Sequence, residues 1–135
     1  ETSFLRSVAA AILVYAALFG ATFPAIPALF PSAQVARQLY PPLCANPFFV
    51  TAGHYEASLV FLVGTDMLHA SGSGAADFLR GGPCRFAFVE KGQERAFVAR
   101  ADAIGLRYAL GPRIEGYNVA TGRPIEITIF MGRES

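Results

Sequence analysis

The sequence predicts an α/β protein in which an N-terminal transmembrane helix precedes a small α/β sandwich with a mixed sheet. Three observations lead to this prediction. No Asp, Glu, Lys or Arg occurs between Arg6 and Arg37, a gap of 30 residues. The chain after this gap alternates short β-branched or aromatic runs with helical patterns. At 135 residues, the chain is long enough for one domain and an appendage but not for several domains.

The composition narrows the classes of function. The chain is 53% hydrophobic and only 16% charged, against roughly 25% charged residues in an ordinary soluble domain. Its formal net charge is +1, without a clustered basic face, so no nucleic-acid partner is expected. The plentiful large apolar residues exclude a disordered chain, and the glycines have no collagen-like period.

Residues 4–23, FLRSVAAAILVYAALFGATF, form the expected membrane helix. A helix of this length spans about 30 Å, close to the hydrocarbon thickness of a bilayer. We favour a retained transmembrane helix, with a cleaved secretory signal and a buried core helix as alternatives. Arg6 at its front end favours a cytoplasmic N-terminus. Residues 32–135 would then form an extracytoplasmic domain, which in a bacterium means the periplasmic side of the inner membrane.

Prolines mark the end of this helix. Pro24, Pro27 and Pro31 lack backbone donors and restrict the residues before them, so residues 24–32 are expected to be irregular. Residues 1–31 are therefore assigned to the helix and its proline-rich exit segment. Ser32 is expected to cap a short helix over residues 33–39.

The domain is expected to contain both strands and helices. Residues 58–63 (SLVFLV) are apolar without interruption and predict a strand covered on both faces. Residues 91–104 place Phe97, Val98, Ala101 and Ile104 at helical intervals and predict an amphipathic helix. A second helix is expected at residues 74–79, and further strands at residues 48–52, 85–89, 107–110, 113–117 and 124–131. Residues 118–123 would connect a hairpin.

The two cysteines are candidates for a disulfide. Cys44 and Cys84 each stand just before a predicted strand, and in a parallel sheet both would lie at the same end. A bridge would close a loop of about 40 residues and stabilise the fold by on the order of 4 kcal/mol. The oxidising periplasm permits this bond. Two separate buried thiols are the alternative.

Metal and cofactor sites are not expected. Cys44, His54, His69 and Cys84 lack the spacing of zinc ligands, and both histidines are expected on the surface or in loops. The glycine pairs match neither a phosphate-binding loop nor a dinucleotide-binding fingerprint, and no nucleophile elbow occurs.

The densest polar cluster beside an apolar run is His54-Tyr55-Glu56. Asp66 follows the strand expected at residues 58–63, whereas Glu56 precedes it. A strand of this length with its flanks would hold the two carboxylates roughly 20–25 Å apart, which excludes a catalytic dyad. Glu56 is therefore expected either to play a structural role or to contact a substrate directly.

Two motifs resemble the C-terminal end of bacterial membrane glycosyltransferases of the aminoarabinose transferase and protein O-mannosyltransferase type. The first is GHYEASLVFLVGT at residues 53–65, and the second is Gly116-Tyr117-Asn118 followed by Gly122-Arg123. Val119 stands where the second family motif has an aromatic residue. The resemblance also includes the preceding transmembrane helix with its terminal proline, and it covers nearly the entire chain.

The resemblance implies a role outside the reaction centre. Such enzymes have many transmembrane helices, take a sugar from a polyprenyl-phosphate donor, and carry their catalytic carboxylate in a loop that this chain lacks. This chain would be the last transmembrane helix and the periplasmic domain, itself non-catalytic, shaping the acceptor side of the active site. Its expected partners are the lipid bilayer, the remaining transmembrane body and, through that body, the lipid-linked sugar. His54, Tyr55 and Glu56 would face the substrate.

A different class of function remains open. An apolar anchor followed by a small α/β domain without a catalytic constellation is also typical of a single-pass membrane-anchored binding or assembly module. The number of hydrophobic spans encoded upstream would distinguish these two interpretations.

Overall fold

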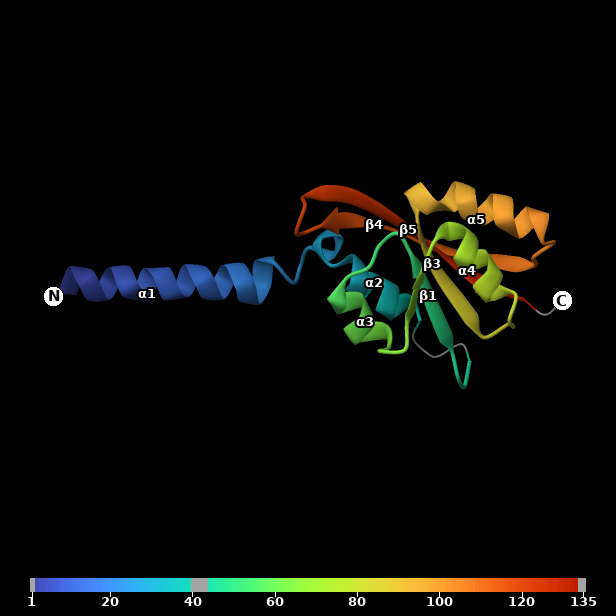
Figure 1. Ribbon diagram of the computed structural model, residues 1–135. Helices are drawn as coiled ribbons and strands as arrows, with labels where there is room; N and C mark the ends of the chain where they lie inside the picture. The colour runs from blue at the N-terminus through green and yellow to red at the C-terminus, as the bar shows by residue number, and fades with distance from the viewer. Residues whose placement is uncertain (1, 40–43, 134–135) are drawn as a thin grey trace.

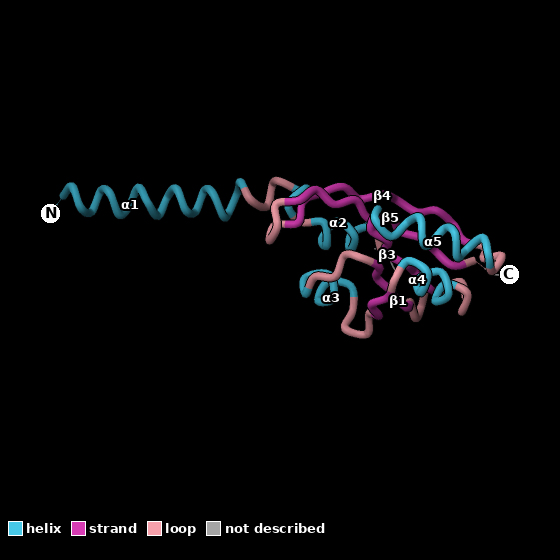
Figure 2. Tube along the Cα trace, turned by 45° about the horizontal axis from the view of Figure 1, so that its top comes forward, coloured by secondary structure: helices cyan, strands magenta, loops and turns pink. Residues whose placement is uncertain are grey.

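The computed structural model describes residues 2–39 and 44–133, and it confirms the predicted mixed α/β fold (Figure 1). An apolar helix projects from one end of a domain that contains a single five-stranded mixed sheet. The Cα trace in a second orientation also shows the apolar helix projecting from one end of the domain (Figure 2).

The projecting helix consists of α1 (Thr2–Ala17) and a π-helical continuation, η1 (Leu18–Thr22). Over Thr2–Thr22 its mean hydropathy is 1.9, and it is long and apolar enough to cross a membrane. None of its residues is buried against the domain. The alternative of a buried core helix is therefore wrong, whereas a membrane anchor and a signal sequence both fit.

The exit segment is more ordered than the prolines alone predict. It contains a short 3₁₀ helix, η2 (Pro27–Leu29), and leads into α2 (Pro31–Gln38). Ser32 does not cap α2, because the helix already begins at Pro31. Proline is compatible with the first helical position, where its missing N–H would have no partner in the helix. The Ser32 side chain instead lies 3.0 Å from the Ser58 hydroxyl.

The sheet has the strand order β2-β1-β3-β5-β4. The three strands β1 (Phe48–Ala52), β2 (Leu68–Ala70) and β3 (Arg85–Glu90) are parallel to one another. β5 (Arg123–Gly132) runs antiparallel to both β3 and β4 (Tyr108–Asn118). The last two strands form the predicted hairpin.

One predicted strand is a helix. Residues 58–63 belong to α3 (Ala57–Val63), and the neighbour of β1 in the sheet is the short strand β2 instead. Only Leu59 of α3 is buried, whereas Phe61 is 85% exposed. An uninterrupted apolar run does not distinguish a buried strand from a helix by its periodicity. Here the assumption that every apolar side chain of the run is buried was wrong.

A second difference concerns β4. The two short strands expected at residues 107–110 and 113–117 are one strand, whose pairing with β5 shifts register between Leu110 and Arg113. Gly111 and Pro112 occupy this irregularity. Proline cannot donate to a strand ladder, so a bulge is a compatible place for it.

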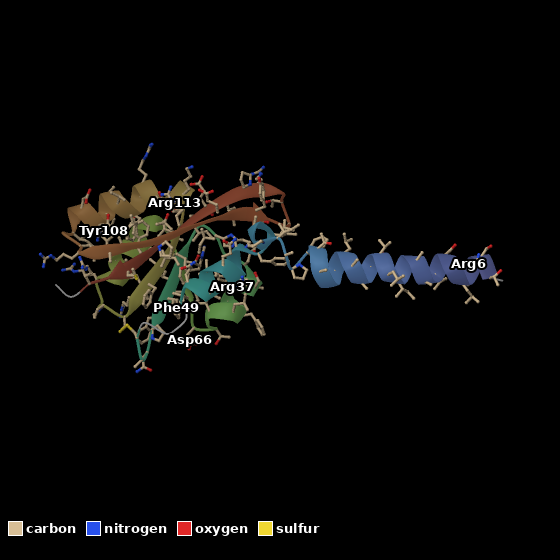
Figure 3. All side chains as sticks on the ribbon, turned by 180° about the vertical axis from the view of Figure 1, so that it is seen from behind. Arg6, Arg37, Phe49, Asp66, Tyr108 and Arg113 are labelled. Carbon is tan, nitrogen blue, oxygen red and sulfur yellow. A yellow bond between two sulfur atoms is a disulfide. The ribbon has the colours of Figure 1, made fainter. Side chains whose placement is uncertain are left out.

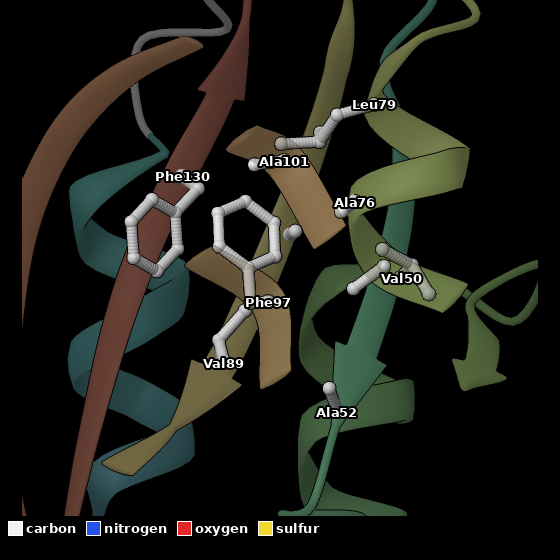
Figure 4. Packing of buried hydrophobic residues seen from close by; sticks show 10 residues of the cluster. Val50, Ala52, Ala76, Leu79, Val89, Phe97, Ala101 and Phe130 are labelled. Carbon is white, nitrogen blue, oxygen red and sulfur yellow. The ribbon is translucent and has the colours of Figure 1, made fainter. Parts of the chain in front are cut away.

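Two apolar clusters sandwich the sheet. α4 (Gly72–Leu79) and α5 (Lys91–Ala103) cover one face, where Phe97 stacks on Phe130 with ring centroids 4.2 Å apart (Figure 4). Val35 of α2 and Leu59 of α3 pack on the other face. The period of two along the strands explains this division: in β3, Ala87 and Val89 join the first cluster, and Phe86 and Phe88 join the second.

Polar contacts attach α5 to the hairpin. The Lys91 ammonium donates to Glu126 Oε1 over 2.6 Å, and this hydrogen bond lowers the pKa of the Glu126 carboxyl. Arg113 donates to both carboxylate oxygens of Glu94, which also accepts from the Thr128 hydroxyl.

A disulfide joins Cys44 to Cys84, whose Cα atoms lie 5.7 Å apart; Figure 3 draws sulfur in yellow. Cys44 precedes β1 and Cys84 precedes β3, and these strands are parallel neighbours. The alternative of two separate thiols is therefore not what the structure contains.

Candidate functional site

The loop that follows β1 carries the three residues expected to face a substrate. Gly53 turns the chain with a φ of +93°, and His54, Tyr55 and Glu56 then lead into α3. The Thr51 hydroxyl, at the end of β1, donates to the His54 carbonyl oxygen and holds this turn. The three side chains occupy three different environments.

His54 lies in the protein interior, not on the surface. Only 4% of the residue is exposed, and its Nε2 has no hydrogen-bond partner among the residues that the structure describes. The nearest carboxylate oxygen, Glu56 Oε2, lies 3.7 Å away, which is beyond hydrogen-bond length. The His54 ring is therefore buried next to Glu56 without a hydrogen bond to it.

The Tyr55 ring lies beside β2. It is exposed, and its ring centroid lies 5.1 Å from that of His69 on β2. Sequence reasoning did not find this contact, because β2 was not predicted. Tyr55 thus borders β2, an outer strand of the sheet.

Glu56 lines an apolar hollow of about 290 Å³. Its Oε2 lies 3.2 Å from the Ser58 hydroxyl, which also lies 3.0 Å from the Ser32 hydroxyl. Because a hydroxyl has one proton, Ser58 can donate to only one of these oxygens at a time. The remaining wall is mostly apolar: the hollow is lined by Leu29, Phe30, Pro31, Ser32, Ala33, Glu56, Ser58, Leu62 and Val119.

The hollow brings together the two sequence motifs, which are far apart along the chain. Glu56, Ser58 and Leu62 come from the first motif, and Val119 comes from the turn of the second. The exit segment passes directly against the second motif, since a Cβ on Gly116 would lie 2.7 Å from the Ala28 carbonyl oxygen. The close approach of these two backbones thus requires the glycine of the second motif.

The hollow lies at the end of the domain from which the apolar helix projects. α2, α3 and the turn between β4 and β5 all lie at the end of the domain nearest α1 (Figures 1 and 2). A carboxylate in an apolar hollow can accept a hydrogen bond from the hydroxyl or ammonium group of a ligand. The apolar part of the same ligand can then contact the walls of the hollow. Among the described residues, no group of three or more His, Cys, Asp or Glu side chains could hold a metal ion.

The placement of Glu56 relative to Asp66 differs from the one expected. The two residues flank the seven-residue helix α3 and not a strand. Such a helix rises only about 10 Å, so the strand geometry behind the expected separation of roughly 20–25 Å does not apply here. Figure 3 labels Asp66, which is not part of the hollow.

Sequence reasoning missed the contributions of Ser32, Phe30 and Leu62 to the hollow. The serine was expected to be a helix cap, and the two apolar residues carry no chemical signal of their own. No family model matches the chain, and comparisons with curated proteins and with solved structures found no similar protein.

Proposed function

We propose that this chain is the C-terminal part of an inner-membrane glycosyltransferase that uses a polyprenyl-phosphate-linked sugar. In this proposal the domain is itself non-catalytic and shapes the acceptor side of an active site in the transmembrane body. One observation carries the proposal: the two motifs that resemble this family meet at one hollow, beside Glu56 and at the end of the domain nearest α1.

Glu56 is the side chain that meets the acceptor in this proposal. Its carboxylate accepts a hydrogen bond from an acceptor hydroxyl or amine at the membrane surface, while Leu62 and Val119 contact the apolar part of the same molecule. His54 acts as a positioning residue, because its buried ring limits how far the Glu56 side chain can retreat into the domain.

The disulfide supports a periplasmic location for the domain. Disulfides persist in oxidising compartments and are rare in the cytosol. The Cys44–Cys84 bond therefore agrees with Arg6 at the start of the helix, which favours a cytoplasmic N-terminus.

The test replaces Glu56 in the complete protein. Glu56→Gln keeps the shape of the side chain but removes its charge, and we expect sugar transfer to an acceptor to fall roughly 10- to 100-fold, the effect of losing one charged hydrogen bond. The measurement is transfer from a radiolabelled polyprenyl-phosphate sugar in membranes. Glu115→Gln, an exposed carboxylate on β4, is the matched control and should transfer normally. Equal rates for both variants would contradict the role of Glu56.

A single-pass binding or assembly module is the second candidate. It is favoured by the chemistry of the hollow, in which Glu56 is the only charged residue in the lining and no catalytic partner contacts it among the described residues. The complete reading frame separates the two proposals. Many further hydrophobic spans upstream support the glycosyltransferase, and their absence supports the module.

A further inference from the structure

Large apolar side chains are exposed at one end of the domain. Phe61 of α3 is 85% exposed and Val119 of the β4–β5 turn is 65% exposed, although both are apolar. Their neighbours Phe30 and Leu62 are exposed as well, as is Ile26 of the exit segment. α3, the turn and the exit segment all lie at the end nearest α1 (Figures 1 and 2).

We call the exposed apolar side chains at this end of the domain the anchor-side face and define it by Ile26, Phe30, Phe61, Leu62 and Val119. The hollow beside Glu56 is lined by Phe30, Leu62 and Val119 together, so three separate segments meet there. A second hollow, of about 260 Å³, continues from Phe30 to Pro24, at the end of the membrane helix. The anchor-side face is therefore continuous with the helix exit.

A positively charged side chain, that of Arg37, lies beside the anchor-side face. Arg37 lines the second hollow with Pro24, Pro27 and Phe30, and it pairs with no carboxylate among the described residues. Arginine next to apolar residues at a helix exit matches the chemistry of a membrane surface, where phosphate groups lie just outside the hydrocarbon. Figure 3 labels Arg37 on α2.

The opposite end of the domain has a different character. There a hollow of about 700 Å³ is lined by Arg80, Arg107 and Arg133, together with the glycines that end α4. Among the described residues, none of these three arginines forms an ion pair. The domain is thus apolar at the end nearest α1 and cationic at the end farthest from it.

We infer that the anchor-side face lies against the lipid bilayer, with Phe61 and Val119 inserted at the level of the headgroups and Arg37 at the phosphates. A helix of 21 residues has a length of about 31 Å, which matches the hydrocarbon core and brings its end to the membrane surface. Any segment at the same end of the domain is then close to that surface. The inference rests on α1 crossing a bilayer and requires no transfer chemistry.

The experiment uses tryptophan as a probe, because the sequence contains none. Single variants Phe61→Trp and Val119→Trp are reconstituted as the full chain into vesicles of phosphatidylcholine and phosphatidylglycerol. The acyl chains carry bromine, a quencher of tryptophan fluorescence, either near the headgroups or near the chain ends. We expect both variants to lose fluorescence with bromine near the headgroups.

Two matched variants control the measurement. Leu13→Trp lies in the middle of the membrane helix and should be quenched most by bromine near the chain ends. Leu110→Trp is 69% exposed on β4, but roughly 26 Å along the strand from the β4–β5 turn, and should keep its fluorescence. A shift on a non-reducing gel verifies the disulfide, and hence the folded domain, in each variant.

Three outcomes would overturn the inference. If Leu13→Trp is quenched but Phe61→Trp and Val119→Trp resemble Leu110→Trp, the helix is inserted and the domain stands away from the bilayer. If the emission of Phe61→Trp and Val119→Trp is shifted to the blue but not quenched, the anchor-side face is covered by protein, such as a second copy of the chain, and not by lipid. If Leu13→Trp is not quenched either, the apolar helix does not insert into the bilayer. None of these results depends on sugar transfer, so failure of the glycosyltransferase proposal is recognised separately by the Glu56→Gln assay.

Discussion

Gly53 is the residue that sets the course of the loop carrying His54 and Glu56. Its φ of +93° lies in the region that favours glycine. A Cβ at this position would lie 2.7 Å from Glu90 Oε2 and 2.8 Å from Glu90 Cβ. A side chain would therefore strain the backbone and also displace Glu90. The positions of the buried imidazole and of the carboxylate in the hollow thus depend on the backbone of a residue that has no side chain of its own.

We expect Gly53→Ala to lower the free energy of unfolding by about 1–3 kcal/mol, the usual cost of a strained backbone position. Urea unfolding of the full chain in detergent, followed by circular dichroism, measures this change. Gly92→Ala is the control, because a Cβ there meets nothing within 4 Å and its backbone is helical. That variant should keep its stability or gain up to about 1 kcal/mol. Equal losses in both variants would refute the argument from φ.

Helix α4 has a low helix propensity and is stabilised by its N-terminal cap. Its sequence, GSGAADFL, contains two glycines in eight residues, each costing up to about 1 kcal/mol relative to alanine. Gly72 is nevertheless required, since a Cβ there would collide with the Gln93 carbonyl oxygen of α5. The close packing of the two helices therefore imposes a residue that weakens one of them. Ser71 offsets this loss by capping α4, accepting a hydrogen bond from the Gly74 N–H over 3.1 Å.

Replacing the cap should destabilise the domain measurably. We expect Ser71→Ala to reduce the free energy of unfolding by about 1 kcal/mol, and Ser71→Asp to retain it, because aspartate caps helices as well as serine does. The same urea titration is used. Ser73→Ala, two residues further into the helix, should have little effect. A loss in Ser71→Asp as large as that in Ser71→Ala would show that the hydroxyl matters for another reason.

The chain as a whole combines an apolar helix long enough to cross a membrane, an apolar anchor-side face and a cationic far end. The disulfide links the segment that enters β1 to the segment that enters β3, two parallel neighbours in the middle of the sheet. It therefore restricts the unfolded chain over a separation of 40 residues. For a domain this small, a covalent link is a large part of the total stability.

Loss of the disulfide should lower the free energy of unfolding by on the order of 4 kcal/mol. Thermal unfolding is compared with and without a reducing agent, and with the double variant Cys44→Ser and Cys84→Ser. We expect reduction to lower the Tm of the native chain to that of the double variant, whose Tm should not respond to the reducing agent. A native Tm that is unchanged by complete reduction would contradict this expectation.

Local patterns were sufficient for much of the fold. The apolar segment without charges predicted the membrane-length helix, and the helical spacing of Phe97 and Ala101 predicted α5. Alternation and β-branched residues predicted β1, β3 and β5, with boundaries within one or two residues. These features depend on neighbours in the sequence, since a helix or a half-buried strand repeats its environment every few residues.

Sequence patterns alone were sufficient to predict the α/β class, the membrane-length helix and the polar cluster in the loop after β1. The helical conformation of residues 58–63 and the pairing of β2 with β1 became apparent only in the folded chain. The folded chain also buries His54 while leaving Tyr55 exposed, and it brings Glu56 and Val119 together across one hollow. This is because an apolar run indicates only a preference for burial, whereas the surface that covers it comes from segments far along the chain.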